Sequence, residues 1–263
     1  MTRILTIAAI VWLGMLRRKD IYVLLLLLGA LLVMLVSLNI FGLGGVTGYV
    51  KDVGLMAAWV FAWILAVTIS TRELPQEEAQ GTIFPLLAKP VTRLQVVLGK
   101  WVGCWSIVTA ATLVFYLLVA LVVQARGGHF FIPTLCQAFF LHAVALGILV
   151  ALGLLFSARM HQDAAAALTY VLTAAAVIVV PRVPELLVRE SGPSGTALLV
   201  LYYLAPHFEL LDMRRRLVHG YEAVDGRVFL AVVLYGLLTA ALYVLLAWLA
   251  YRRKRFVRGN LSE

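Results

Sequence analysis

Six uncharged, apolar stretches of about 20 residues constrain the fold of this chain more than any other feature. A helix that crosses a bilayer core of about 30 Å needs about 20 residues, and each stretch approaches or exceeds that length. None shows the alternating pattern of a transmembrane β-strand. The sequence therefore predicts an all-α, polytopic membrane protein with six transmembrane helices. The six stretches are 21–41, 53–71, 101–123, 133–158, 164–181 and 228–251.

The amino-acid composition supports a membrane protein. Hydrophobic residues make up 63% of the chain and charged residues 13%, whereas a soluble domain is about 45–50% apolar. The net charge of +9 raises the possibility of a nucleic-acid partner. However, the basic residues lie in short clusters between the apolar stretches, so we expect contact with membrane lipid and not with nucleic acid.

The basic clusters also predict the orientation. With six spans both termini lie on one side, and the segments on that side hold 14 of the 22 Lys and Arg residues. The positive-inside rule therefore places both termini in the cytoplasm, with Arg214-Arg215-Arg216 as the main exception. The whole of 1–263 is expected to form one transmembrane domain. Its parts are an interfacial N-terminal helix in 1–20, spans one and two in 21–71, a cytoplasmic coupling region in 72–95, spans three to five in 96–181, an outer segment in 182–227, span six in 228–251 and a basic cytoplasmic tail in 252–263.

Two parts of this plan are apolar but too short to cross the membrane. Residues 4–16 precede the basic cluster at 17–19, and 13 residues fit a helix lying in the membrane interface. In the outer segment the run 197–205 predicts a re-entrant or interfacial pair of short helices. His207 and Glu209 follow this run. Two candidate ligands do not make a metal site, so we favour a hydrogen-bonded or solvated pair over a metal or proton role.

The segment between the second and third spans is predicted to be structured. Thr82 can cap a short helix, and Pro90 would end it, because the residue before a proline disfavours helical geometry. Ile83, Leu86 and Leu87 would share one face of this helix. That apolar face could pack on lipid or on the protein's own helix ends, or it could bind a soluble subunit.

A second signal in this segment marks the start of the third transmembrane helix. Thr92 and Gln95 have the spacing of a capping box. The helix is therefore expected to begin about nine residues before Trp101, outside the bilayer core.

These motifs resemble those of the permease subunit of type-2 ATP-binding-cassette (ABC) exporters. The matching residues are Glu77-Glu-Ala-Gln-Gly81-Thr82, Leu86-Leu87-Ala-Lys-Pro90-Val-Thr-Arg93 and Leu98-Gly99-Lys100. Ala79 departs from the pattern, since many members carry a second Glu there. The general plan is similar over nearly the full chain, although only 73–100 is specific. Within the family, the chain loosely resembles the short permease of the exporter that serves nitrous-oxide-reductase maturation.

The resemblance implies a dimer of permease chains, identical or different, in the bacterial inner membrane. Each permease would rest on one of two copies of a separate ABC ATPase, which uses ATP and Mg, while this chain binds no cofactor. The coupling residues implied are Glu73, Glu77, Gly81, Thr82, Ile83, Leu86, Leu87, Pro90 and Arg93.

Missing motifs are consistent with a transport subunit that is not itself an enzyme. Gly99-Lys100 lacks the upstream glycine of a phosphate-binding loop, and no span carries an acidic residue in its middle. The alternatives are a self-sufficient channel or secondary transporter and, less favoured, a membrane-embedded enzyme using His142 or the His207/Glu209 pair. Possible pathway residues are His142, Tyr170, Thr173, Tyr235 and Thr239, for which structural hydrogen bonding is the alternative explanation.

Overall fold

The computed structural model describes residues 2–16, 19–37, 46–79, 91–189 and 193–254. Every regular element in these ranges is a helix, which confirms the all-α prediction. The elements are α1 (Thr2–Leu16), α2 (Asp20–Ser37), α3 (Val46–Ala79), α5 (Arg93–Ala125), α6 (Ile132–Ser157), α7 (Gln162–Ile178), η2 (Val180–Arg182), α8 (Val183–Arg189), α9 (Pro193–Leu204), η3 (Phe208–Leu211), α10 (Arg214–Val218) and α11 (Gly226–Arg252).

Five helical stretches in the described part of the chain are long and apolar enough to cross a membrane. They are Thr47–Ala79, Arg93–Ala125, Ile132–Ser157, Gln162–Leu187 and Gly226–Arg252, which correspond to the second to sixth predicted spans. The protein is therefore a multi-pass membrane protein. The first predicted span overlaps α2, a shorter apolar helix, and continues into residues 38–41, which lie outside the described residues. A membrane crossing by this first predicted span, which would bring the total to six, stays a prediction.

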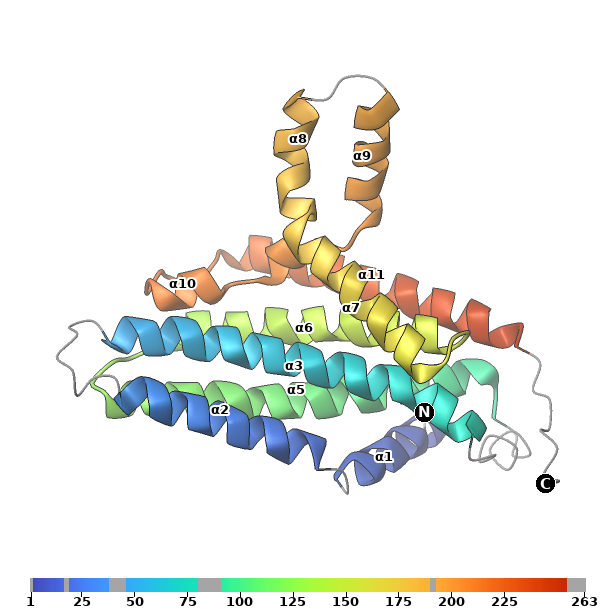
Figure 1. The fold of residues 1–263 in the computed structure, drawn as a ribbon, viewed down its shortest axis with the longest axis horizontal. Coiled ribbons are helices and arrows are strands. Elements are labelled where there is room, and N and C mark those ends of the chain that lie inside the picture. Colours follow the sequence, from blue (N-terminus) through green and yellow to red (C-terminus); the bar gives the residue numbers. More distant parts are fainter. Residues whose placement is uncertain (1, 17–18, 38–45, 80–90, 190–192, 255–263) are drawn as a thin grey trace.

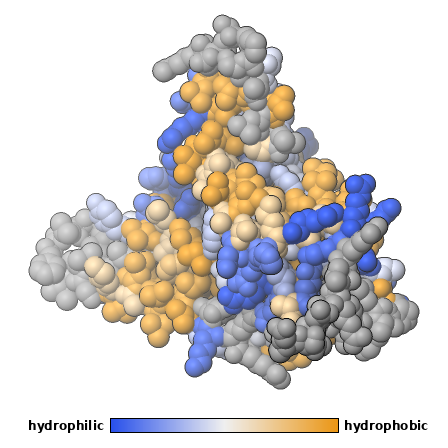
Figure 2. All heavy atoms as spheres, turned by 45° about the vertical axis from the view of Figure 1, so that its right-hand side comes forward, coloured by the Kyte–Doolittle hydropathy of each residue, from blue (hydrophilic) through white to orange (hydrophobic). Residues whose placement is uncertain are grey.

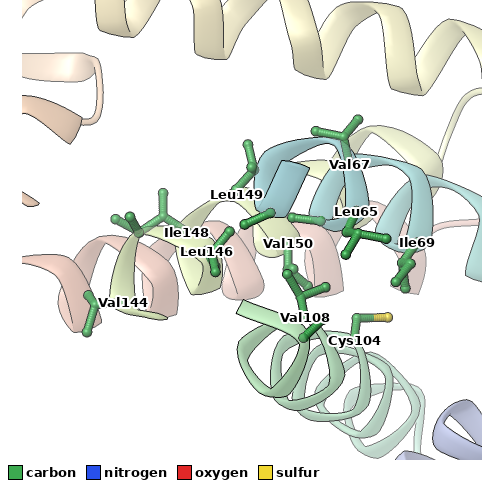
Figure 3. Close-up of a cluster of buried hydrophobic side chains, with 14 of the residues drawn as sticks. Leu65, Val67, Ile69, Cys104, Val108, Val144, Leu146, Ile148, Leu149 and Val150 are labelled. Atoms are coloured by element: carbon green, nitrogen blue, oxygen red, sulfur yellow. The ribbon is translucent and has the colours of Figure 1, made fainter. Parts of the chain in front are cut away.

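The helix α6 forms the centre of a bundle with α3, α5 and α11 (Figure 1). All of residues 141–154 are buried, because this helix is apolar on every side. Its Leu146, Leu149 and Val150 meet Leu65 of α3 and Val108 of α5 in one cluster (Figure 3). By contrast, only 17% of the apolar stretch of α11 is buried, against 78% for α6, so α11 leaves most of its surface for lipid or a partner.

The N-terminal helix α1 packs closely along α5. A Cβ atom on Gly99 would lie 2.7 Å from the Cβ of Ile7, and one on Gly103 would lie 2.9 Å from the Cβ of Val11. The indole nitrogen of Trp12 also donates a hydrogen bond of 2.8 Å to the Ser106 hydroxyl. The predicted N-terminal helix is therefore present as α1. Gly99 and Gly103, one helical turn apart, let α1 approach the α5 backbone. Its place at the membrane interface stays a prediction.

The predicted outer segment contains the expected pair of short helices. The helices α8 and α9 lie side by side and stand out from the bundle (Figure 1). After them, η3 and α10 return to pack on α6 and α3, and Arg214 forms a two-pronged ion pair with Asp212, closest at 2.7 Å. The membrane depth of this segment stays a prediction.

Candidate functional site at the helix ends around residues 80–90

Three helix ends meet at one end of the bundle. The helix α3 ends at Ala79, α5 begins at Arg93 and α11 ends at Arg252, all near the right-hand side of Figure 1. We call this the 80–90 end, because the segment 80–90 joins α3 to α5 here. Figure 2 brings this end forward and shows hydrophilic side chains gathered on it, with hydrophobic side chains on the flanks.

The predicted coupling residues are only partly described. Glu73, Glu77 and Arg93 have defined places on α3 and α5. The expected short helix lies outside the described residues, together with Gly81, Thr82, Ile83, Leu86, Leu87 and Pro90.

The helix α3 extends further than its predicted span. Residues 72–79, expected to open the coupling region, continue the helix through Pro75. Because Glu73 and Glu77 are four residues apart, this extension places them on one helix face. The first eight residues of the predicted coupling region therefore belong to α3, and the continued helix carries both carboxylates.

Both carboxylates bind one buried lysine on α5. The ammonium nitrogen of Lys100 lies 2.6 Å from Glu73 Oε2 and 2.5 Å from Glu77 Oε1. Lys100 is 2% exposed and Glu73 9% exposed, so these charges are largely removed from solvent. Removing one partner from a buried ion pair leaves an uncompensated charge and costs about 3–5 kcal/mol. The cluster therefore fixes the end of α3 against α5.

The start of α5 is fixed by the predicted capping box. The backbone amide of Gln95 donates to Thr92 Oγ1 at 3.3 Å, and the backbone amide of Thr92 donates to the side-chain Oε1 of Gln95 at 3.0 Å. These bonds satisfy two backbone N–H groups. The N–H of Gln95 is one of those at a helix start that have no partner within the helix. The capping prediction and the helix start at Arg93 are confirmed.

Arg93 connects the start of α5 to the end of α11. Its Nη1 atom donates to the carbonyl oxygens of Tyr251, Arg252 and Lys254 at 3.2, 2.6 and 3.0 Å. On the other flank of the segment, Lys254 Nζ pairs with Glu78 Oε2 at 2.7 Å. The contacts of Arg93 with the end of α11 and of Lys254 with Glu78 were not anticipated, because sequence spacing carries no signal for partners 158 to 176 positions apart.

The possible pathway residues with hydroxyl groups have different hydrogen-bond partners. Tyr170 OH donates to the Ile64 carbonyl of α3 at 3.4 Å, and Tyr235 OH accepts from the His207 amide at 3.0 Å. Thr173 and Thr239 donate to carbonyls four residues earlier in their own helices, at 2.6 and 2.8 Å. Tyr170 therefore makes a hydrogen bond between helices, whereas the two threonines bond within their own helices, since a hydroxyl four residues after a carbonyl can reach that carbonyl.

His142 lies apart from these hydroxyl groups, in the bundle interior. Its ring is fully buried and stacks on Trp59 with centroids 4.4 Å apart. Neither ring nitrogen has a hydrogen-bond partner among the described residues. His207 Nδ1 is 3.5 Å from Glu209 Oε1, which supports a loosely associated pair. The described residues contain no group of three or more His, Cys, Asp or Glu side chains that could hold a metal.

Comparison with known proteins identifies the family. No curated protein matched the chain. A sequence model of the family described as ABC-2 family transporter protein matches residues 13–256, which include the helix ends around 80–90 and all five long apolar helices. This match covers nearly the whole chain and confirms the resemblance seen in the sequence. The chain therefore belongs to the ABC-2 transporter family, as a transmembrane permease of an ABC-type transporter.

Proposed function

We propose that this chain is the permease subunit of an ABC exporter in the bacterial inner membrane. Two permease chains form the substrate pathway, both termini of each chain lie in the cytoplasm, and two copies of a separate ATPase bind at segment 80–90. The family generally works with an ATP-binding subunit, which supports this kind of partner. The distribution of Lys and Arg supports the orientation.

The ionic cluster at the 80–90 end is the observation that carries this proposal. A subunit that pushes on a segment moves the adjoining helices only if the segment is joined to them rigidly. Here Lys100 fixes the end of α3 to α5, and the Thr92 capping box fixes the start of α5. A continuous helix on one flank and a capped helix on the other are suited to transmit a displacement into the membrane.

The contact with the ATPase would come from the apolar face predicted in segment 80–90. Leu86 and Leu87 are two of its three members and would insert into a groove of the partner. Replacing both with Asp would place two charges in that contact, whereas replacing both with Met keeps an apolar side chain of similar volume.

Affinity purification of the full chain from native membranes tests the proposal. We expect an ATPase subunit to accompany the unmodified chain and the double Met variant, and to be lost from Leu86→Asp/Leu87→Asp while that variant remains in the membrane. An ATPase that stays bound to the double Asp variant would contradict docking at this face. Substrate flux in liposomes from the purified chain alone, without ATP, would instead favour a self-sufficient channel or carrier.

A further inference from the structure

The contacts at the end of α11 point to a specific route for the displacement, provided that the proposed docking is correct. We propose that α11, the last transmembrane helix, moves together with the end of α3 and the start of α5, because its own end is bonded to both of them. Arg93 and the Glu78–Lys254 pair act as positioning residues that join this helix to the site where the ATPase acts.

The start of α5, which follows segment 80–90 in the chain, makes the stronger connection to the end of α11. Arg93 lies three residues after Pro90, and its Nη1 atom donates to three carbonyl oxygens at or just after the end of α11. Carbonyls at a helix C-terminus lack intrahelical partners and carry partial negative charge, so a guanidinium group is well suited to bind them. Because the acceptors are backbone atoms, the connection holds the helix itself and not one mobile side chain.

The end of α3, which precedes segment 80–90 in the chain, is also joined to the end of α11. Glu78 lies two residues before the segment and pairs with Lys254, two residues after the end of α11. These side chains are 23% and 22% exposed, so this pair alone contributes little to stability. Its contribution is geometric, because together with Arg93 it holds the end of α11 at two points, one on α3 and one on α5.

The rest of α11 allows such a motion. This helix packs mainly on α6 and to a smaller extent on α5, and most of its apolar stretch is exposed in the single chain. A helix held on one side can shift along the bundle with less repacking than α6, which is buried on all sides. Because its end is bonded to α3 and α5 and one of its sides is exposed, α11 is well placed to follow a movement of those two helix ends.

Distances between spin labels in the reconstituted complex with the ATPase test this proposal. Cysteines introduced at Arg253, after α11, and Arg159, after α6, would carry the labels, since both residues are exposed and both helices end on the same side of the bundle. The native Cys104 and Cys136 would be replaced by Ala and Ser. We expect the distance between the labels to change between the nucleotide-free and vanadate-trapped complexes.

The Arg93→Ala variant should lose more than half of this change, measured in complexes that retain the ATPase. Arg227→Ala is the matched control, because Arg227 is exposed and lies at the opposite end of α11. Arg93→Lys should restore part of the change, since it keeps a cation at the carbonyl cluster. No change in the unmodified complex, or a full change in Arg93→Ala, would overturn the proposal.

The Glu78–Lys254 pair gives a second arm that leaves the Arg93 side chain itself in place. Glu78→Lys should reduce the nucleotide-dependent change through like-charge repulsion, and adding Lys254→Glu should restore it by re-forming the pair in the opposite sense. A double variant no better than the single one would contradict the role of this pair. Failure to purify any ATPase with the unmodified chain would instead refute the docking proposal, so the two failures are distinguishable.

Discussion

The close approach of α1 to α5 predicts the effect of one added methyl group. Gly99 faces Ile7 so closely that a Cβ atom would lie 2.7 Å from the Ile7 Cβ and 2.8 Å from its Cγ2. Ordinary contacts begin at 3.4 Å. The Ile7 Cβ is attached directly to the backbone and cannot rotate away. Gly99→Ala therefore requires α1 to move as a body by about 0.7 Å or to separate from α5.

The expected cost follows from overpacking. Extra methyl or methylene groups in a packed interface cost about 1–3 kcal/mol. Replacing glycine by alanine also favours a helix by about 1 kcal/mol, which partly offsets this cost. Gly29→Ala in α2 isolates the second effect, because nothing lies within 4 Å of a Cβ atom at that position. Gly99→Ala should therefore be less stable than Gly29→Ala by about 1–3 kcal/mol.

Equilibrium unfolding in mixed micelles would measure the free energy of unfolding, and hydrogen exchange would measure how firmly α1 is docked. In Gly99→Ala we expect a lower free energy of unfolding and faster exchange in α1, with exchange in α6 unchanged. Gly103→Ala should behave similarly, because its Cβ would lie 2.9 Å from the Val11 Cβ. Equal stability of Gly99→Ala and Gly29→Ala, with unchanged exchange in α1, would refute the argument that these glycines are needed for docking.

Three further variants test other parts of the structure. Lys100→Met should destabilise the protein by about 3–5 kcal/mol, because it leaves two carboxylates without their buried partner, whereas Lys100→Arg should cost less; equal unfolding free energies for the two would argue against the ionic cluster. Thr92→Ala should cost about 1 kcal/mol and Thr92→Ser almost nothing, as measured by thermal unfolding, and a neutral Thr92→Ala would contradict the capping role. His142→Phe should keep the stack on Trp59 and remove two nitrogens that lack described partners, so its unfolding free energy should match or exceed that of the unmodified protein. A loss of more than about 2 kcal/mol in His142→Phe would show that the imidazole makes a favourable polar contact.

Local signals predicted several parts of the fold correctly. Five of the apolar stretches correspond to long apolar helices, and Thr92 with Gln95 marked the start of α5, because both signals depend on residues close together in the chain. The end of α3 was missed for a related reason. A proline in a charged stretch favours a loop, but the pairing of Glu73 and Glu77 with Lys100 stabilises the helix beyond the predicted span.

The candidate site was less predictable, because its contacts join distant parts of the chain. Lys100 was noted as part of a family motif, yet nothing in the local sequence pairs it with Glu73. The role of Gly103 could have been inferred from its spacing with Gly99, since two small residues four positions apart allow close helix packing. The bonding partners of Thr173 and Thr239 were not predictable, because periodicity places a hydroxyl on a helix face but does not determine whether it bonds to its own helix.

The docking of α1 on α5 also has a consequence for biosynthesis. Trp12 and its partner Ser106 are separated by 94 positions, so the first helix is made well before the surface that receives it. During translation α2 and α3 are made after α1 and before α5, so α1 has no α5 surface to pack on in that interval. Its exposed Leu5, Ile10 and Leu13 provide an apolar face for that interval. The contact of α1 with Gly99 and Gly103 can therefore form only after α5, the second of the five long apolar helices, has been made.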